Sequence, residues 1–185
     1  MVRTNHNIGS ARKCIEDSYA VDWLVSNRTG NENVGGEKRM KANERRGAAK
    51  GMHAVHVRTT RRTELQDVTD QIAAAVHESG CPDGVCHLYV PHTTAGVTIN
   101  EGYDPAVAQD IAAEFDRLVP RLRNSAHAEG NSDSHTKTAL VGSTETVWIV
   151  AGKLALGRWQ RIFFAEFDGP RSRELRVKIV PDPQA

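Results

Sequence analysis

The chain has 185 residues, of which 39% are hydrophobic, and a formal net charge of +1 at pH 7. This length and composition predict one domain with its own buried core and exclude a fibrous or wholly disordered protein. No apolar run approaches the ~18 residues needed to cross a bilayer, and the N-terminus has no apolar signal segment, so we expect a soluble cytoplasmic protein without a membrane partner.

The first part of the chain, residues 1–51, is polar and broken by glycine, and it holds ten Lys/Arg against six Asp/Glu. Such a segment cannot bury enough surface to offset its ordering entropy. We therefore expect it to be a disordered or poorly packed N-terminal extension. Its basic residues are interspersed with acids and lack interleaved aromatic residues, so we expect no nucleic-acid partner.

Residues 52–185 are expected to form a single domain, because the pattern changes abruptly after Met52. Residues 53–60 (HAVHVRTT) alternate between polar and apolar side chains as a half-buried strand does. Residues 64–80 predict an amphipathic helix, with Asp67 or Thr69 as its cap and Gly80 at its end.

Strand and helix signals continue through the middle of the chain. Residues 85–101 predict two strands on either side of the interruption PHTTAG. Residues 103–120 predict the clearest helix, because Asp104 suits the cap, Pro105 suits the first turn and apolar residues line one face.

A polar segment follows, and the rest of the chain is rich in β signals. Residues 127–140 (HAEGNSDSHTKTAL) are predicted to be a loop, and three strands separated by Gly-containing turns are predicted at 145–152, 159–169 and 174–180. Because strands and helices do not alternate one for one, a doubly wound parallel sheet is excluded. We expect an α+β domain with a mostly antiparallel sheet and two main helices.

Three histidines, His92, His127 and His135, fall at predicted strand ends or loops. Neutral imidazole is a common metal ligand, and three such ligands leave a coordination position open in catalytic zinc sites. Their spacing alone does not select this reading over structural histidines that are solvated or hydrogen-bonded.

Carboxylates lie near these histidines in the sequence, namely Glu101, Asp104, Glu129 and Asp133. They are candidates for general acid or base, or for orienting a ligand histidine. A helix cap explains Asp104 equally well, and exposure to solvent explains Glu129 and Asp133. Glu101 is the strongest catalytic candidate, because it directly follows an apolar strand and precedes a glycine, where a side chain often faces a cleft.

Other side chains are candidates for holding a ligand. Arg171 and Arg173 lie beside a Gly-Pro turn at a strand end, where guanidinium groups can clamp phosphate or carboxylate, although two solvated arginines of a hairpin explain them as well. The hydroxyl groups of Thr93 and Thr94 could bind an anion. Trp159 and Gln160 could pack against a heteroaromatic ring.

Several signatures of other chemistries are absent from the sequence. There is no Walker loop, no GxGxxG after a strand and no GxSxG elbow, so nucleotide cradling and serine hydrolysis are poorly supported. The three cysteines, Cys14, Cys81 and Cys86, form no even-numbered framework and no CxxC pair, so we expect reduced thiols.

In order and spacing, the segments PHTTAGVTINEGYDP, HAEGNSDSHTKTALVG and GKLALGRWQRIFFAEFDGPRSR resemble the YjbQ family, which is also labelled secondary thiamine-phosphate synthase. The resemblance covers about Val55 to Val180. It implies an α+β fold, a homotrimer, and a pocket between subunits in which His92, His127 and His135 hold a metal ion. It also places Asn131 among the residues that bind the substrate.

The family label implies that a hydroxymethylpyrimidine diphosphate is joined to a thiazole phosphate with release of pyrophosphate, as a weak secondary activity. The substrate is then a phosphorylated small molecule, and Arg171 or Arg173 stabilises the leaving group. Three imidazoles favour zinc or a similar transition metal over magnesium. Two alternatives stay open: a metal-dependent hydrolase or lyase with Glu101 as base, and a non-catalytic trimeric metal- or metabolite-binding protein.

Overall fold

The structure is a computed structural model that describes residues 52–122, 124 and 126–183. The extension predicted over residues 1–51, with Cys14, lies outside the described residues. No helix among the residues described is both long enough and apolar enough to cross a membrane.

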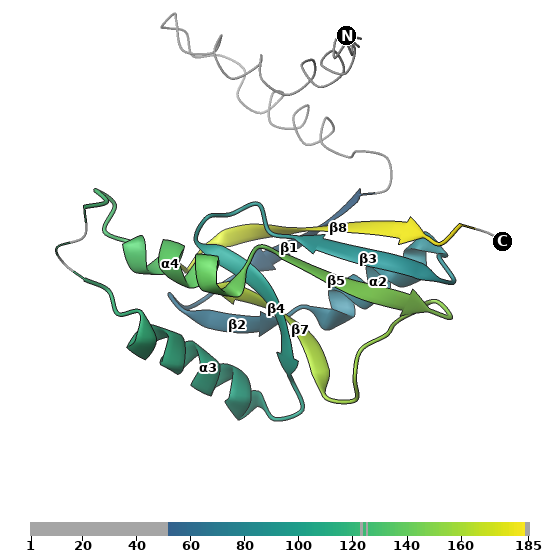
Figure 1. The fold of residues 1–185 in the computed structure, drawn as a ribbon, viewed down its shortest axis with the longest axis horizontal. Coiled ribbons are helices and arrows are strands. Elements are labelled where there is room, and N and C mark those ends of the chain that lie inside the picture. The colour runs from purple at the N-terminus through teal and green to yellow at the C-terminus, as the bar shows by residue number, and fades with distance from the viewer. Residues whose placement is uncertain (1–51, 123, 125, 184–185) are drawn as a thin grey trace, which may run out of the picture. The chain divides into compact units, whose positions relative to one another are not determined.

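Two antiparallel sheets face each other in the domain (Figure 1). One has five strands in the order β1-β8-β3-β5-β6, and the other has three in the order β2-β7-β4. The strands are β1 (Met52–Arg58), β2 (Glu64–Asp67), β3 (Gly84–Tyr89), β4 (Ala95–Glu101), β5 (Thr144–Val150), β6 (Lys153–Leu154), β7 (Gln160–Glu166) and β8 (Ser172–Pro181).

The core lies between the two sheets and under helix α2 (Thr69–Ser79). Alternate residues of the strands point inward, as the period of two requires, so that Leu88 of β3 and Val177 of β8 meet Phe164 of β7. Helix α2 adds Ile72 and Val76 from one face. The predicted α+β class with antiparallel strands is therefore confirmed.

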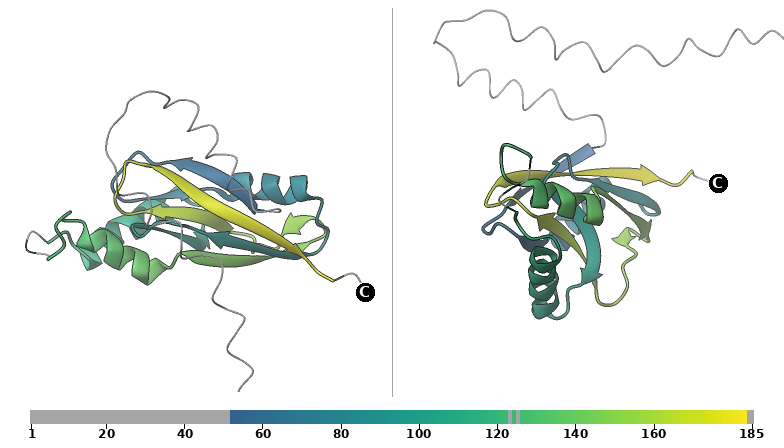
Figure 2. Two further views of the ribbon diagram at one scale, coloured as in Figure 1. Left: turned by 90° about the horizontal axis from the view of Figure 1, so that it is seen from above. Right: turned by 60° about the vertical axis from the view of Figure 1, so that its left-hand side comes forward.

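Helix α3 (Pro105–Leu118) lies alongside the three-stranded sheet, away from the five-stranded one (Figure 1). The right-hand view of Figure 2 shows α3 and β8 on opposite sides of the domain. The Asp104 side chain accepts a hydrogen bond from the Ala106 N–H at 2.8 Å, and Pro105 stands in the first turn, so the predicted start of this helix is confirmed.

The sequence analysis included residues 64–67 at the capped start of the helical segment and missed that they form strand β2. Leu65 pairs with Ala165 of β7, and this sheet pairing outweighs the local helical pattern. The helix begins at Thr69, whose N–H donates to the Asp67 carboxylate at 2.9 Å, and it ends at Gly80 in the left-handed conformation (φ 67°), as predicted.

The prediction of a loop over residues 127–140 was also wrong in its second half, which forms helix α4 (Ser132–Val141). The domain therefore has three described helices where two were expected. Apolar periodicity does not reveal α4 because its buried face is polar, being made of Asp133, Ser134, Lys137 and Thr138.

Candidate functional site

The three predicted histidines gather around α4. His135 lies in the first turns of α4, His127 lies in the loop before it, and His92 lies between β3 and β4. The rings of His127 and His135 are 5.2 Å apart between centres, at 80° to each other. His92 and His135 line one pocket of about 520 Å³, and His127 and His135 line another of about 430 Å³. His135 is thus common to both pockets.

The His92 ring is held by the main chain of β8. The Glu174 N–H donates a hydrogen bond to His92 Nε2 at 3.0 Å. Burial lowers the pKa of His92 below its usual range, and the nearby positive charge of Arg173 lowers it further, against the opposing charges of Glu166 and Glu174. The hydrogen bond with the Glu174 main chain also opposes this shift, but the net direction favours the neutral ring.

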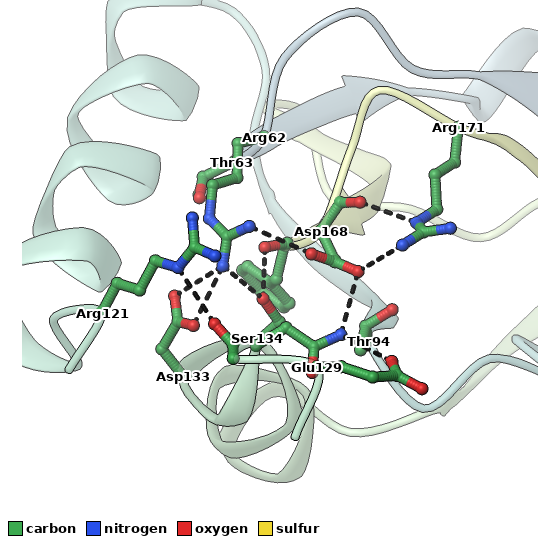
Figure 3. Close-up of polar contacts among 12 residues, drawn as sticks. Arg62, Thr63, Thr94, Arg121, Glu129, Asp133, Ser134, Asp168 and Arg171 are labelled. Carbon is green, nitrogen blue, oxygen red and sulfur yellow. Dashed lines mark hydrogen bonds and ion pairs between the residues drawn. The ribbon is translucent and has the colours of Figure 1, made fainter. Parts of the chain in front are cut away.

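A buried carboxylate fixes Arg171 (Figure 3). Asp168 accepts hydrogen bonds from Arg171 Nη2 at 2.6 Å, from Arg62 Nη1 at 3.0 Å and from Asn131 Nδ2 at 3.1 Å. Burial alone raises the pKa of Asp168, but these three partners outweigh it and hold the pKa below its ordinary value. The Arg171 side chain remains 51% exposed, so its guanidinium group is both fixed and accessible.

Arg173, in contrast, is enclosed. Its guanidinium group donates to both oxygens of buried Glu166, at 2.7 and 2.6 Å, and to Thr94 Oγ1 at 2.8 Å. The Arg173 side chain is only 8% exposed. Arg173 therefore holds Thr94 in place, at the start of β4 close to His92, rather than facing a ligand.

Asn131 stands directly before α4 and is buried. Its Nδ2 donates to Asp168 and, at 3.4 Å, to Glu129, whose carboxylate also lies 3.9 Å from His127 Nε2. Within the described part of the chain, Asn131 Oδ1 is the buried side-chain atom that has no hydrogen-bond partner. It is an acceptor at the edge of the histidine cluster.

The predicted residues Glu101, Trp159 and Gln160 lie together elsewhere. They line a pocket of about 420 Å³ at the end of β4 and the start of β7, where Glu101 pairs with Gln160. Thr94 precedes the other end of β4, which at about 3.3 Å per residue is roughly 20 Å away. One chain therefore does not bring this cluster to the histidines. Asp104 caps α3 at the same distant end.

The residues fit a metal ion only in part. Two imidazoles on one tetrahedral zinc ion have ring centres roughly 5 Å apart, given zinc–nitrogen distances of about 2.0–2.1 Å, and the His127–His135 pair meets this spacing. His92 does not fit as a third ligand, because its Nε2 already accepts the Glu174 N–H. No group of three or more His, Cys, Asp or Glu side chains among the described residues is arranged to hold a metal ion.

Sequence reasoning missed the buried charges that organise this region. Arg62 bridges Asp168 and Asp133, and Lys137 donates to Asp133 at 3.2 Å and to Asp116 at 2.5 Å. The one available signal was a glutamate and an aspartate in the otherwise apolar run FFAEFDG. Charged side chains in such a run require partners if they are buried.

Comparisons with known proteins all point to the same protein family. Residues 53–182 match the family model described as UPF0047 protein YjbQ-like. The UPF0047 protein of Methanocaldococcus jannaschii is 53% identical over 126 residues, which cover 68% of this chain and 91% of that protein. The UPF0047 protein YugU of Bacillus subtilis is 41% identical over 130 residues, or 70% of this chain and 98% of that protein.

Solved structures give the same result. A YjbQ/UPF0047 family protein from Clostridium acetobutylicum, 44% identical, superposes with a TM-score of 0.67 over 69% of this chain and 99% of its own. A protein from Sulfolobus solfataricus described as YbjQ-like and of unknown function, 32% identical, gives a TM-score of 0.68 over 71% of this chain and 96% of its own.

Proposed function

Because the chain belongs to the YjbQ-like UPF0047 family, we propose that the surface around His135 binds a zinc-like divalent metal ion and a phosphorylated small molecule. The observation that carries the proposal is that His135 lies in both histidine-lined pockets, while the fixed and accessible Arg171 interacts with Glu129, whose carboxylate lies 3.9 Å from His127 Nε2. Imidazole nitrogen beside guanidinium suits a transition metal together with a phosphate group.

The reaction proposed for this surface is that of a thiamine-phosphate synthase. The bond between the methylene carbon of hydroxymethylpyrimidine diphosphate and its diphosphate oxygen breaks, and pyrophosphate leaves with the electron pair. The ring nitrogen of the thiazole phosphate then forms a bond to that carbon. Arg171 stabilises the charge that builds on the departing oxygens, and Asp168 keeps the guanidinium group oriented.

His127 and His135 are the residues proposed to hold the metal ion, since their spacing fits a pair of imidazole ligands. A bound divalent ion supplies positive charge next to phosphate oxygens. Imidazole ligands favour zinc or a similar transition metal, whereas magnesium prefers oxygen ligands.

A second copy of the chain completes the site in this proposal. The cluster of Glu101, Trp159 and Gln160 includes an indole that is 57% exposed, yet it lies at the far end of β4 from the histidines. In a head-to-tail contact, the Glu101 end of β4 in one copy lies against the histidine end of β4 in the next copy. Three such contacts form a closed ring. The exposed Trp159 then packs on the ligand bound by the neighbouring subunit.

The first test is the metal content of the purified full chain. We expect zinc in stoichiometric amount in the wild type and its loss in His135→Ala, which still folds because His135 is not fully buried. Its unfolding midpoint falls to that of the zinc-free wild type, because bound metal stabilises the folded chain. The same substitution at His77, an exposed histidine on α2, is the matched control and keeps the metal. Full zinc content in His135→Ala contradicts the proposed site.

The second test supplies both thiamine precursors and measures pyrophosphate release. We expect the wild type to release pyrophosphate above background, and we expect Arg171→Ala and His135→Ala to lose this activity. Equal rates in the wild type and in the two variants reject the synthase reaction.

A further inference from the structure

The hydrogen bond between β8 and His92 fixes which nitrogen of the ring carries a proton. The Glu174 N–H donates to Nε2 at 3.0 Å, and a ring nitrogen accepts only through a lone pair. Nε2 is therefore unprotonated, the ring is neutral, and its single proton resides on Nδ1.

The donor at Glu174 cannot retreat from the ring. Glu174 belongs to β8, where it pairs with His56 of β1, and the next residue, Leu175, is fully buried in the core. A rotation of this backbone N–H away from His92 breaks the register of two sheet strands. The main chain thus imposes the tautomer on His92.

This tautomer conflicts with metal coordination by His92. Binding through Nε2 requires the lone pair that the Glu174 N–H occupies. Binding through Nδ1 requires the proton to move to Nε2, where it faces the Glu174 N–H, donor against donor. Either route costs the hydrogen bond and leaves the Glu174 N–H without its acceptor.

The free side of the ring instead suits an acceptor atom. Nδ1 makes no hydrogen bond to any residue that the structure describes, and His92 lines the pocket of about 520 Å³ beside His135 and the exposed hydroxyl of Thr93. Ser143, at the end of α4, adds a second hydroxyl group to the same wall. The two hydroxyl groups and the ring N–H can all donate hydrogen bonds to an acceptor in this pocket.

We propose that His92 is a hydrogen-bond donor, which binds an anionic oxygen of the ligand through Nδ1–H, and is not the third ligand of a metal ion. The ligand class is a phosphate or diphosphate ester whose oxygens lie in the pocket between His92 and His135. This inference rests on the location of the proposed site but not on the presence of a metal ion.

The direct test is the NMR spectrum of the imidazole nitrogens of the labelled full chain, recorded before and after addition of zinc. The expected result is an Nδ1–H tautomer for His92 whose nitrogen shifts do not move with zinc, while those of His135 do. An Nε2–H tautomer, or a zinc-dependent shift of either His92 nitrogen as large as that of His135, overturns the proposal. This measurement needs no variant for its main result; spectra of the histidine variants assign the signals.

The variant His92→Gln separates the two roles, because the glutamine amide oxygen replaces Nε2 as acceptor for the Glu174 N–H while Nδ1–H is lost. We expect unchanged zinc content and an affinity for inorganic pyrophosphate that is lower by about tenfold to a hundredfold, as for a lost hydrogen bond to a charged group. His77→Gln is the control and retains both. Loss of zinc from His92→Gln, or unchanged pyrophosphate affinity, contradicts the inference.

These outcomes are distinguishable from failure of the proposed function. Absence of zinc from the wild type and from every variant rejects the metal site around His135. The tautomer of His92 and the pyrophosphate affinity of His92→Gln still decide the inference in that case.

Discussion

Asp168 joins three separate parts of the chain through one buried carboxylate. Arg62 reaches it from the segment before β2, Asn131 from the start of α4 and Arg171 from the turn before β8. The position of the accessible guanidinium group therefore depends on a residue that itself faces no ligand.

Replacing Asp168 by asparagine tests this dependence. Removing one partner of a buried ion pair costs 3–5 kcal/mol, but Arg62 and Arg171 are 34% and 51% exposed, so solvent screens part of the loss. We expect Asp168→Asn to lower the free energy of unfolding by about 2 kcal/mol, measured by urea denaturation at neutral pH. Glu114→Gln, which breaks an exposed pair with Arg117, is the control and leaves the midpoint unchanged.

The same variant makes a pH prediction. The pKa of Asp168 is lower in the folded chain than the ordinary value of about 3.9. Its contribution to stability is therefore complete above that ordinary value and is lost as the pH falls through the folded pKa. Asp133 behaves alike: burial alone raises its pKa, but Lys137 and Arg62 outweigh it. We expect the wild type to lose stability below about pH 4 and Asp168→Asn to lose less; parallel acid profiles contradict the assignment.

At this scale the sequence was informative about exposed chemistry and silent about buried charge. His92, His127 and His135 were selected as candidates because imidazoles in a polar, glycine-broken segment have no role in a core. Asp168 was passed over, because a carboxylate at a strand end before Gly-Pro has the same pattern as an ordinary turn residue. Two of its three partners, Arg62 and Asn131, lie 106 and 37 residues away along the chain, so no local pattern pairs them with it.

Among the elements, α4 shows why a helix can escape sequence analysis. Its inward face is held by hydrogen bonds and ion pairs: Asp133 to Arg62, Ser134 Oγ to the Phe167 carbonyl oxygen at 2.6 Å, and Lys137 to Asp116. An apolar stripe with a period of 3.6 is therefore absent, although α2 and α3, which carry such stripes, were predicted. Strand β2 was missed for a different reason, because its four residues are too few to show the alternation of a strand.

The end of α4, which lines the pocket between His92 and His135, packs closely against β4. The Val97 N–H donates to the Gly142 carbonyl oxygen at 3.2 Å, and a Cβ on Gly96 would lie only 2.4 Å from that oxygen. Only glycine at position 96 allows the end of the helix to approach the strand this closely. Because the obstacle is backbone, a side chain there moves the whole end of α4.

Gly96→Ala is therefore expected to destabilise the domain by about 1–3 kcal/mol, the usual cost of overpacking, and to weaken pyrophosphate binding by displacing α4. Thermal unfolding and a pyrophosphate titration measure the two effects. Gly157→Ala is the matched control for stability alone, since the added Cβ meets only the side chain of Gln160 and the residue lines the pocket that holds Glu101 and Trp159. A Gly96→Ala variant with wild-type stability shows that the strand and helix separate without cost.

For the molecule as a whole, the two groups of predicted residues cannot act together within one chain. Thr93, Asn131 and Arg171 lie near the histidines, whereas Glu101, Trp159 and Gln160 lie roughly 20 Å away along β4. The sequence predicted both groups but not their separation, because the direction of a strand decides which of its ends faces a given loop. The shared site proposed above therefore requires an assembly of several copies.

Mixing two inactive variants tests this arrangement. In a head-to-tail ring each site takes its histidines from one chain and Glu101 from the next. The experiment mixes His135→Ala chains and Glu101→Ala chains in equal amounts by unfolding and refolding. A site is intact wherever a Glu101→Ala chain supplies the histidines and a His135→Ala chain supplies the glutamate. Random assembly makes this about one quarter of all sites, so we expect about a quarter of the wild-type rate of pyrophosphate release. Refolding each variant alone is the control and gives no activity. If the mixture stays inactive while wild type treated alike recovers, both groups act within one chain and the proposal of a shared site is wrong. Activity of refolded Glu101→Ala alone shows instead that Glu101 takes no part, which also contradicts the proposal.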